Sequence, residues 1–154
     1  MEISTCVKYV GVNDHQVDLF EGQYKVPNGM SYNSYVILDE KIAVMDTVDG
    51  FFTEEWLNNV EQVLSGKTPD YLVIQHMEPD HSASIPAFLK KYPNATVVST
   101  AKGFQFMEQF FPEFFAGQGL PAEQRIVAAN DGVLELGQHS LHFVYAPWCI
   151  GRRL

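Results

Sequence analysis

Four side chains of metal-binding type lie within six residues of this sequence. They follow directly on the apolar run 71–74 and are His76, Glu78, Asp80 and His81. Two imidazoles and two carboxylates form a mixed nitrogen and oxygen donor set, which suits iron, manganese or zinc. We therefore expect a metal site in the loop after a buried strand. The alternative is a solvated turn with ordinary helix-capping residues.

The spacing of these residues favours two metal ions over one. Residues at i and i+2 of an extended backbone project to the same side, which brings His76 and Glu78 together. Pro79 then bends the chain, and Asp80 and His81 follow at once. Four side chains on so short a loop do not easily reach a single ion. We therefore expect the first pair to bind one ion and the second pair to bind its neighbour.

Composition limits the class of protein. The chain has 154 residues, of which 46% are hydrophobic, enough for one domain with a sizeable core. Its formal net charge of -9 argues against nucleic-acid and anionic-membrane partners, because both need a basic surface. The sequence has no apolar run of transmembrane length and no signal-peptide pattern at its start. We expect a cytoplasmic protein in which Cys6 and Cys149 are free thiols.

The pattern of apolar residues predicts strands in the first third of the chain, then alternating strands and helices, then strands again. The expected strands are 6–12, 17–20, 32–38, 41–45, 70–75, 95–99, 125–128, 133–136 and 140–145. One expected helix has Thr53 as its N-cap and ends near Gly66, and two others cover 82–92 and 102–111. This order of elements is typical of a layered α/β sandwich.

Two further groups of residues favour structural roles. The phenylalanines between residues 104 and 115 are expected to pack in the core and its loops rather than to hold a cofactor. His139 and His142 lie at the last expected strand, where we expect them to face solvent or to form hydrogen bonds rather than to bind metal. His15 is expected to be a turn residue.

Over nearly its whole length, and most clearly in three segments, the chain resembles the N-terminal half of the metallo-β-lactamase-like domain of flavodiiron proteins, also called A-type flavoproteins. The segments are 29–35, 44–47 and 71–81. Hydrolases of the same superfamily usually have a histidine where this chain has Glu78, and a carboxylate there favours iron over zinc. The resemblance implies an α/β fold, an αββα sandwich of which the chain holds the first half and part of the second sheet. It also implies that Asp46 contacts the metal ligands and orients them without binding the metal itself.

The resemblance implies an activity and cofactors as well. Flavodiiron proteins reduce dioxygen to water, or nitric oxide to nitrous oxide, at two non-haem iron ions. FMN in a flavodoxin-like domain delivers the electrons, and rubredoxin or a similar donor supplies them. On this basis His76 and Glu78 would bind one iron, and the pair Asp80 and His81 the other. The resemblance further implies a homodimer or tetramer.

Two alternatives to this activity stay open. The first is a zinc-dependent hydrolase of the same superfamily, with Asp80 as the base for a metal-bound water. Glu78 argues against it. The second is a truncated, non-catalytic fragment, so that enzymatic activity of this chain is itself an open question.

The end of the sequence departs from the family pattern. After Ala146 and Pro147 the family has a His-Trp-Pro motif, and codons for Trp148 to Arg152 read one base earlier can spell Met-Val-His-Trp-Pro. We expect residues 1–147 to form a partial metallo-β-lactamase-like diiron domain and 148–154 to be an aberrant, frameshifted tail, with the flavodoxin-like domain absent. A genuine short protein in which Cys149 is a ligand is the alternative.

Overall fold

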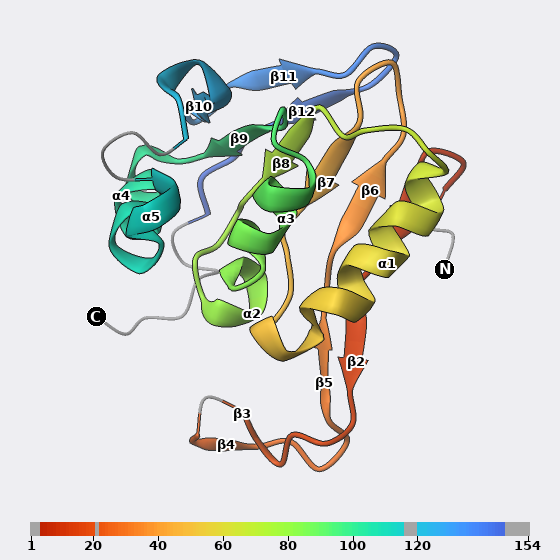
Figure 1. The fold of residues 1–154 in the computed structure, drawn as a ribbon, viewed down its shortest axis with the longest axis vertical. Coiled ribbons are helices and arrows are strands. Elements are labelled where there is room, and N and C mark those ends of the chain that lie inside the picture. Colours follow the sequence, from red (N-terminus) through yellow and green to blue (C-terminus); the bar gives the residue numbers. More distant parts are fainter. Residues whose placement is uncertain (1–3, 21, 116–119, 147–154) are drawn as a thin grey trace.

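A six-stranded mixed sheet forms the centre of the computed structural model (Figure 1). The structure describes residues 4–20, 22–115 and 120–146. In spatial order the strands are β1 (Val7–Tyr9), β6 (Tyr35–Ile37), β7 (Ala43–Met45), β8 (Tyr71–Val73), β9 (Thr96–Ser99) and β10 (Arg125–Val127). The β1–β6 and β6–β7 pairs are antiparallel, whereas β7 to β10 run parallel to one another.

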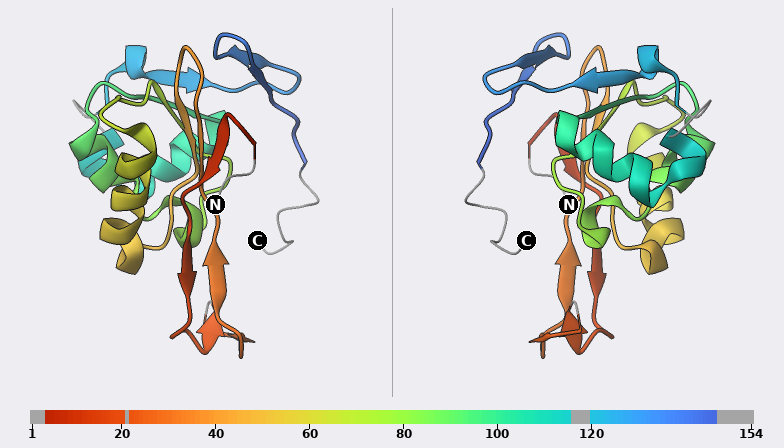
Figure 2. Two further views of the ribbon diagram at one scale, coloured as in Figure 1. Left: turned by 90° about the vertical axis from the view of Figure 1, so that its right-hand side faces the viewer. Right: turned by 90° about the vertical axis from the view of Figure 1, so that its left-hand side faces the viewer.

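Helices cover one face of this sheet. The longer ones are α1 (Thr53–Leu64), α3 (Ile85–Lys91) and α4 (Ala101–Phe110), and the short ones are η1 (Gly50–Phe52), α2 (Pro79–Ser82), α5 (Pro112–Phe115) and η2 (Ala122–Gln124). Figure 2 shows them on one side of the sheet, with the hairpin of β11 (Val133–Glu135) and β12 (Ser140–His142) on the other. The layers are therefore helices, central sheet and a second small sheet.

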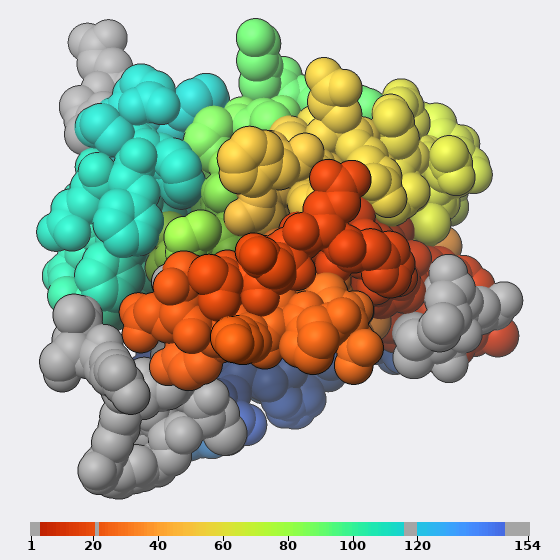
Figure 3. All heavy atoms as spheres, turned by 90° about the horizontal axis from the view of Figure 1, so that it is seen from below, coloured from red at the N-terminus to blue at the C-terminus, as the bar shows by residue number. Residues whose placement is uncertain are grey.

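A long ladder extends from the lower end of the sheet. It consists of β2 (Val12–Asp14) paired with β5 (Met30–Tyr32), and it ends in the hairpin of β3 (Leu19–Phe20) and β4 (Tyr24–Lys25). Figure 3 looks at this end of the molecule, where the red and orange N-terminal strands lie beside the yellow and green segments of the helical layer. The ladder thereby lies beside the helical layer at this end of the molecule.

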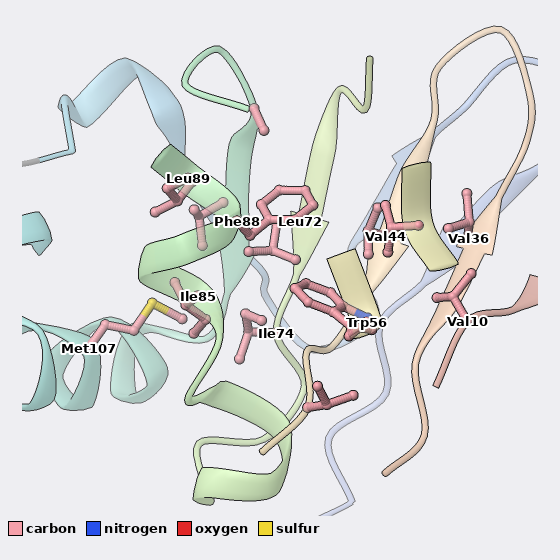
Figure 4. Close-up of a cluster of buried hydrophobic side chains, with 14 of the residues drawn as sticks. Val10, Val36, Val44, Trp56, Leu72, Ile74, Ile85, Phe88, Leu89 and Met107 are labelled. Atoms are coloured by element: carbon pink, nitrogen blue, oxygen red, sulfur yellow. The ribbon is translucent and has the colours of Figure 1, made fainter. Parts of the chain in front are cut away.

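Successive residues of a strand point to opposite faces of the sheet. Both faces are buried, because the helices cover one and the β11–β12 hairpin packs on the other. On the helical side, Val44, Leu72 and Ile74 belong to a cluster that includes Trp56 and Phe88 (Figure 4). On the other side a second cluster joins the sheet to the β11–β12 hairpin: Ala43, Tyr71, Val73, Val98, Ala128, Leu134 and Leu136. The run 71–74 is apolar throughout because it is buried on both faces.

The expected elements are present, but two expected strands are divided. The strand expected over 6–12 breaks at Gly11, where a side chain would collide with the Tyr32 carbonyl, since its Cβ would lie 2.2 Å from that oxygen. The strand expected over 32–38 breaks at residues 33–34, because Tyr32 pairs with β2 whereas Tyr35 pairs with β1 and β7. In both cases the chain passes between the central sheet and the lower ladder.

The expected helix over 82–92 is wrong in its start and its continuity. Pro79 and Pro86 each occupy the first turn of a helix, where the missing N–H does no harm, so the segment forms α2 and then α3. Thr53 is not the N-cap of α1. The N-cap is Phe52, which makes no side-chain capping bond, and the Thr53 hydroxyl instead donates to the Gly50 carbonyl at 2.9 Å.

The phenylalanines near α4 are mostly core residues, as expected. Phe104 and Phe115 are buried, and Phe106, Phe111 and Phe114 pack partly buried against the main cluster. Phe110 differs, with 54% of its surface exposed. Within the described part of the chain, no helix is long and apolar enough to span a membrane. The expectations for the tail 148–154 lie outside the described residues.

Two phenylalanines provide a matched test of the core. Phe88 is fully buried between α3 and the sheet, whereas Phe51 is 97% exposed. We expect Phe88→Ala to lower the free energy of unfolding by about 3–5 kcal/mol, because it leaves a cavity. Phe51→Ala should change it by less than about 0.5 kcal/mol. Urea unfolding of both variants measures the difference, and equal losses would contradict this assignment of the core.

Candidate metal centre

The predicted ligands follow the carboxyl ends of two parallel strands. Asp46 comes directly after β7, and His76 comes shortly after β8. The two strands pair in register, with Met45 opposite Val73. Loops that follow parallel strands leave the sheet at the same edge, where open α/β sheets place their binding sites. The topology therefore brings Asp46 and the loop 76–81 together.

The four predicted ligands lie close together as two pairs. Nε2 of His76 is 3.0 Å from Oε2 of Glu78, and Nε2 of His81 is 3.5 Å from Oδ2 of Asp80. The rings of His76 and His81 are 5.3 Å apart, centroid to centroid. The two pairs thus sit side by side on the loop, with Glu78 the most exposed of the four at 45% of its side chain.

Neither pair is a complete metal shell. Among residues 4–20, 22–115 and 120–146, no group of three His, Cys, Asp or Glu side chains is placed to hold one ion. Metal ions of the type that this donor set favours take four or more ligands. A metal ion at either pair would therefore need further donors to be held tightly.

Asp46 determines the orientation of one ligand. Its Oδ2 atom lies 3.2 Å from Nδ1 of His81, and since a carboxylate only accepts, Nδ1 carries the proton. The lone pair of His81 is then on Nε2, the atom that faces Asp80. This arrangement of a carboxylate behind a histidine is usual for metal-binding histidines. The donor set and the tautomer of His81 both fit a metal ion.

Gln75 is a partner of Asp46 that sequence reasoning missed. Its backbone N–H donates to Oδ1 at 2.7 Å, and its side-chain amide donates to Oδ2 at 3.1 Å. Asp46 itself adopts a left-handed backbone conformation, with φ of 55°, which Asp tolerates better than most residues. A polar residue at the end of the apolar run 71–74 was the available signal in the sequence.

Thr47 and Ser34 also hold the site and were not predicted. The backbone N–H and the hydroxyl of Thr47 both donate to the His81 carbonyl, at 2.8 and 2.9 Å. The buried Ser34 hydroxyl donates to the Asp46 carbonyl at 3.0 Å and accepts from the Trp56 indole N–H at 2.9 Å. The position of the loop therefore depends on the core beneath α1.

The pKa values of His81 and Asp80 are both raised, so the protonated form of each predicted ligand is favoured. The hydrogen bond to Asp46 raises the pKa of His81 above its ordinary value, and its effect exceeds the opposing effect of burial. Burial raises the pKa of Asp80, against the lowering effect of neighbouring His81. Because metal ligands must be deprotonated, metal binding at this loop must release protons and must strengthen as the pH rises.

An open cavity of about 640 Å³ adjoins Asp80. It lies between the lower ladder and the turn before α1, and its wall includes Phe20, Tyr32, Phe52 and Asp49. The size is typical of small-molecule sites. Asp80 is thus reachable from solvent through an opening with a partly aromatic wall.

Replacement of Asp46 by Asn tests its hold on His81. Asn tolerates the left-handed backbone but lacks the charge that raises the pKa of His81. In metal-free protein, the pKa of His81 should fall in Asp46→Asn, and NMR titration of the imidazole protons measures it. His139, which Asp46 does not contact, should titrate unchanged.

The same variant has a defined pH dependence of stability. The pKa of His81 is raised in the folded state, so its stabilising effect is fully present below about pH 6.5, the ordinary histidine pKa, and is lost as the pH rises through the raised value. The loss of unfolding free energy in Asp46→Asn should therefore shrink toward alkaline pH. A loss that grows with pH would contradict the role of this pair.

Comparisons with known proteins identify the family of this chain. A family model described as "ODP family beta lactamase" matches residues 30–151. A nitric oxide reductase of Moorella thermoacetica is 32% identical over 146 residues, which are 94% of this chain and 35% of the relative. Diflavin flavoprotein A 1 of Synechocystis is 34% identical over 135 residues, 87% of this chain and 22% of the relative. The chain thus spans between about a fifth and a third of these relatives.

Solved structures show the same fold. Rubredoxin oxygen:oxidoreductase from Desulfovibrio gigas has a TM-score of 0.84 at 30% identity, covering 94% of this chain and 34% of that one. The flavodiiron protein from Giardia intestinalis has a TM-score of 0.80 at 30% identity, covering 92% and 32%. These matches confirm the expected metallo-β-lactamase-like α/β fold and the resemblance read from the sequence. The chain belongs to the ODP family of β-lactamase-like domains, the family found in flavodiiron proteins.

Proposed function

We propose that this chain supplies ligands to a two-iron centre that reduces dioxygen, nitric oxide or both. The observation that carries the proposal is the two adjacent pairs of side chains on one loop, His76 with Glu78 and Asp80 with His81. The Asp46 carboxylate contacts Nδ1 of His81 on the side away from Asp80. Relatives named for nitric oxide reduction and for oxygen reduction with rubredoxin support it. The donor set supports iron, because Glu78 adds a hard oxygen ligand.

The residues divide between the two ions. Nε2 of His76 and the carboxylate of Glu78 would hold one iron, and the carboxylate of Asp80 and Nε2 of His81 the other. Iron bound there supplies the electrons that the diatomic substrate accepts. Asp46 keeps the proton of His81 on Nδ1, so that Nε2 stays available as a ligand.

The cavity beside Asp80 suits a small uncharged substrate. Its aromatic wall offers no cation for an anionic substrate, since its ionisable lining residues are Asp14, Tyr32, Asp49 and Asp80. A diatomic gas needs no hydrogen-bonding contacts to enter such a space. The acidic lining would instead disfavour anionic metabolites by charge repulsion.

The remaining components of the proposal come from the family. We propose that FMN, carried on a flavodoxin-like domain, passes electrons to the iron ions, and that rubredoxin or a similar protein donates them. A homodimer or tetramer would bring the flavin of one subunit to the iron of another. The reducing cytoplasm is the proposed location, which agrees with the free thiol of Cys6.

Gas consumption tests the proposed activity. Protein that carries the flavodoxin-like domain with FMN, purified anaerobically and supplied with reduced rubredoxin, should consume nitric oxide or dioxygen in an electrode chamber. Asp80→Asn removes the negative charge of one proposed iron ligand and should reduce both iron content and rate by at least about tenfold. Asp131→Asn changes an exposed aspartate on the β10–β11 connection and should leave both unchanged. Full iron content and full rate in Asp80→Asn would disprove the assignment.

Glu78 is expected to determine which metal binds. Glu78→His exchanges a hard oxygen donor for a borderline nitrogen and should shift the ratio of bound iron to zinc toward zinc. Loading with equal concentrations of ferrous and zinc ions, followed by elemental analysis, measures this ratio. Glu135→His adds a histidine at an exposed position of β11 and serves as the control. A parent protein that already prefers zinc would support the hydrolase alternative instead.

A further inference from the structure

A second cluster of reactive side chains lies at the other end of the central sheet. It consists of Cys6, immediately before β1, Asp39, two residues after the end of β6, and His139, immediately before β12. Strands β1 and β6 pair antiparallel with Val7 opposite Ile37, so that Cys6 and the β6–β7 turn share one edge of the sheet. This is the edge that carries the upper turns in Figure 1, opposite the metal loop.

The three side chains form a hydrogen-bonded series. Nδ1 of His139 is 2.7 Å from Oδ2 of Asp39, and Nε2 of the same ring is 3.7 Å from Sγ of Cys6. The order of groups is therefore thiol, imidazole, carboxylate. The same order activates the nucleophile in enzymes with Cys-His-Asp or Ser-His-Asp triads, which are recognised by geometry rather than by sequence position.

Asp39 is held as a carboxylate. Desolvation raises its pKa, but hydrogen bonds from the backbone N–H groups of Gln138 and Glu40 and from His139 outweigh that effect, so that its pKa lies well below the usual range. Because this carboxylate accepts only, it keeps a proton on Nδ1 of His139. The unprotonated Nε2 then faces the Cys6 thiol as a base.

The backbone holds this arrangement in place. Gly137 has φ of 133°, and a Cβ there would lie 2.7 Å from Oδ1 of Asp39, so only glycine allows the two turns to approach so closely. The Lys41 N–H donates to the Leu136 carbonyl at 2.8 Å and ties the same turns together. These backbone contacts already join the turns. The contact between His139 and Cys6 is therefore not needed to hold the two turns together.

The thiol is accessible to small molecules. Cys6 is partly exposed, and 53% of the His139 side chain is exposed. The Ser4 hydroxyl lies 3.4 Å from Sγ and can stabilise negative charge on sulfur. Besides Asp39 and His139, the charged residues and histidines of β1, the β6–β7 turn and the β11–β12 hairpin are Lys8, Glu40, Lys41, Glu135 and His142. A partly exposed thiol beside a base is the environment in which cysteines react.

We propose that Cys6 is an activated thiol that exchanges with low-molecular-weight disulfides, a modification site separate from the metal centre. As Sγ attacks one sulfur of the disulfide, the thiol proton passes to Nε2 of His139. The bond between the two sulfurs of the small molecule breaks and a new one forms to Cys6. The leaving thiolate takes the proton from His139. One small disulfide and one protein thiol become one mixed disulfide and one small thiol.

The kinetics of mixed-disulfide formation test this proposal. The parent for the experiment is the full chain with Cys149→Ser, so that Cys6 is the one remaining cysteine. Dipyridyl disulfide reports the released thiol by absorbance, and glutathione disulfide with intact-mass detection confirms the adduct. Cys6→Ser should abolish both signals. Thermal melting of each variant establishes that it is folded.

His139→Gln removes the base at an exposed position, and His142→Gln removes a nearby exposed histidine that does not contact Cys6. We expect His139→Gln to slow the reaction at neutral pH about tenfold or more and His142→Gln to leave it unchanged. The rate of the parent should also fall less steeply toward pH 6 than that of His139→Gln. Equal rates and equal pH profiles in folded parent and folded His139→Gln would overturn the proposal, as would an unreactive Cys6.

Discussion

The Asp46 carboxylate is the interaction on which the metal loop depends. It is buried, and a buried carboxylate is stable only where hydrogen bonds replace its lost water. Gln75 and His81 provide those bonds, so the groups that satisfy the charge also fix the end of β8 and the direction of the His81 ring. The Ser34 hydroxyl, anchored by Trp56, holds the backbone of Asp46 from below. The geometry of the ligands therefore depends on the packing of the core.

The two ends of the central sheet carry different chemistry because the strands are connected differently. Crossovers through helices join β7 to β8 and β8 to β9, so the loops after these strands meet at one edge, where the predicted metal ligands lie. Tight turns join β6 to β7 and β11 to β12 at the opposite edge, where Cys6 meets them. The two sites share no residue.

Local signals in the sequence were sufficient for most elements and for the close approach of His76 to Glu78 and of Asp80 to His81. The apolar run 71–74 predicts a strand buried on both faces, and the turn at Pro79 places the four ligands in two pairs by chain geometry alone. Breaks at Gly11 and at residues 33–34 could not be predicted, because each depends on which partner strand is present. The same is true of Gln75, whose role requires β7 beside β8, and of Ser34, whose role requires α1 to pack over the β6–β7 pair.

The Cys6 cluster shows why such sites escape a reading of sequence. Cys6 and His139 are 133 positions apart, and neither has a local pattern that marks it as reactive. The turns at Asp39 and Gly137 are visible in the sequence, but their contact is not. The antiparallel pairing of β1 with β6 brings Cys6 to Asp39, and the packing of the β11–β12 hairpin on the sheet brings His139 to both. A site assembled from three non-local segments can be recognised only in the folded chain, because tertiary contacts alone determine which titratable groups become neighbours.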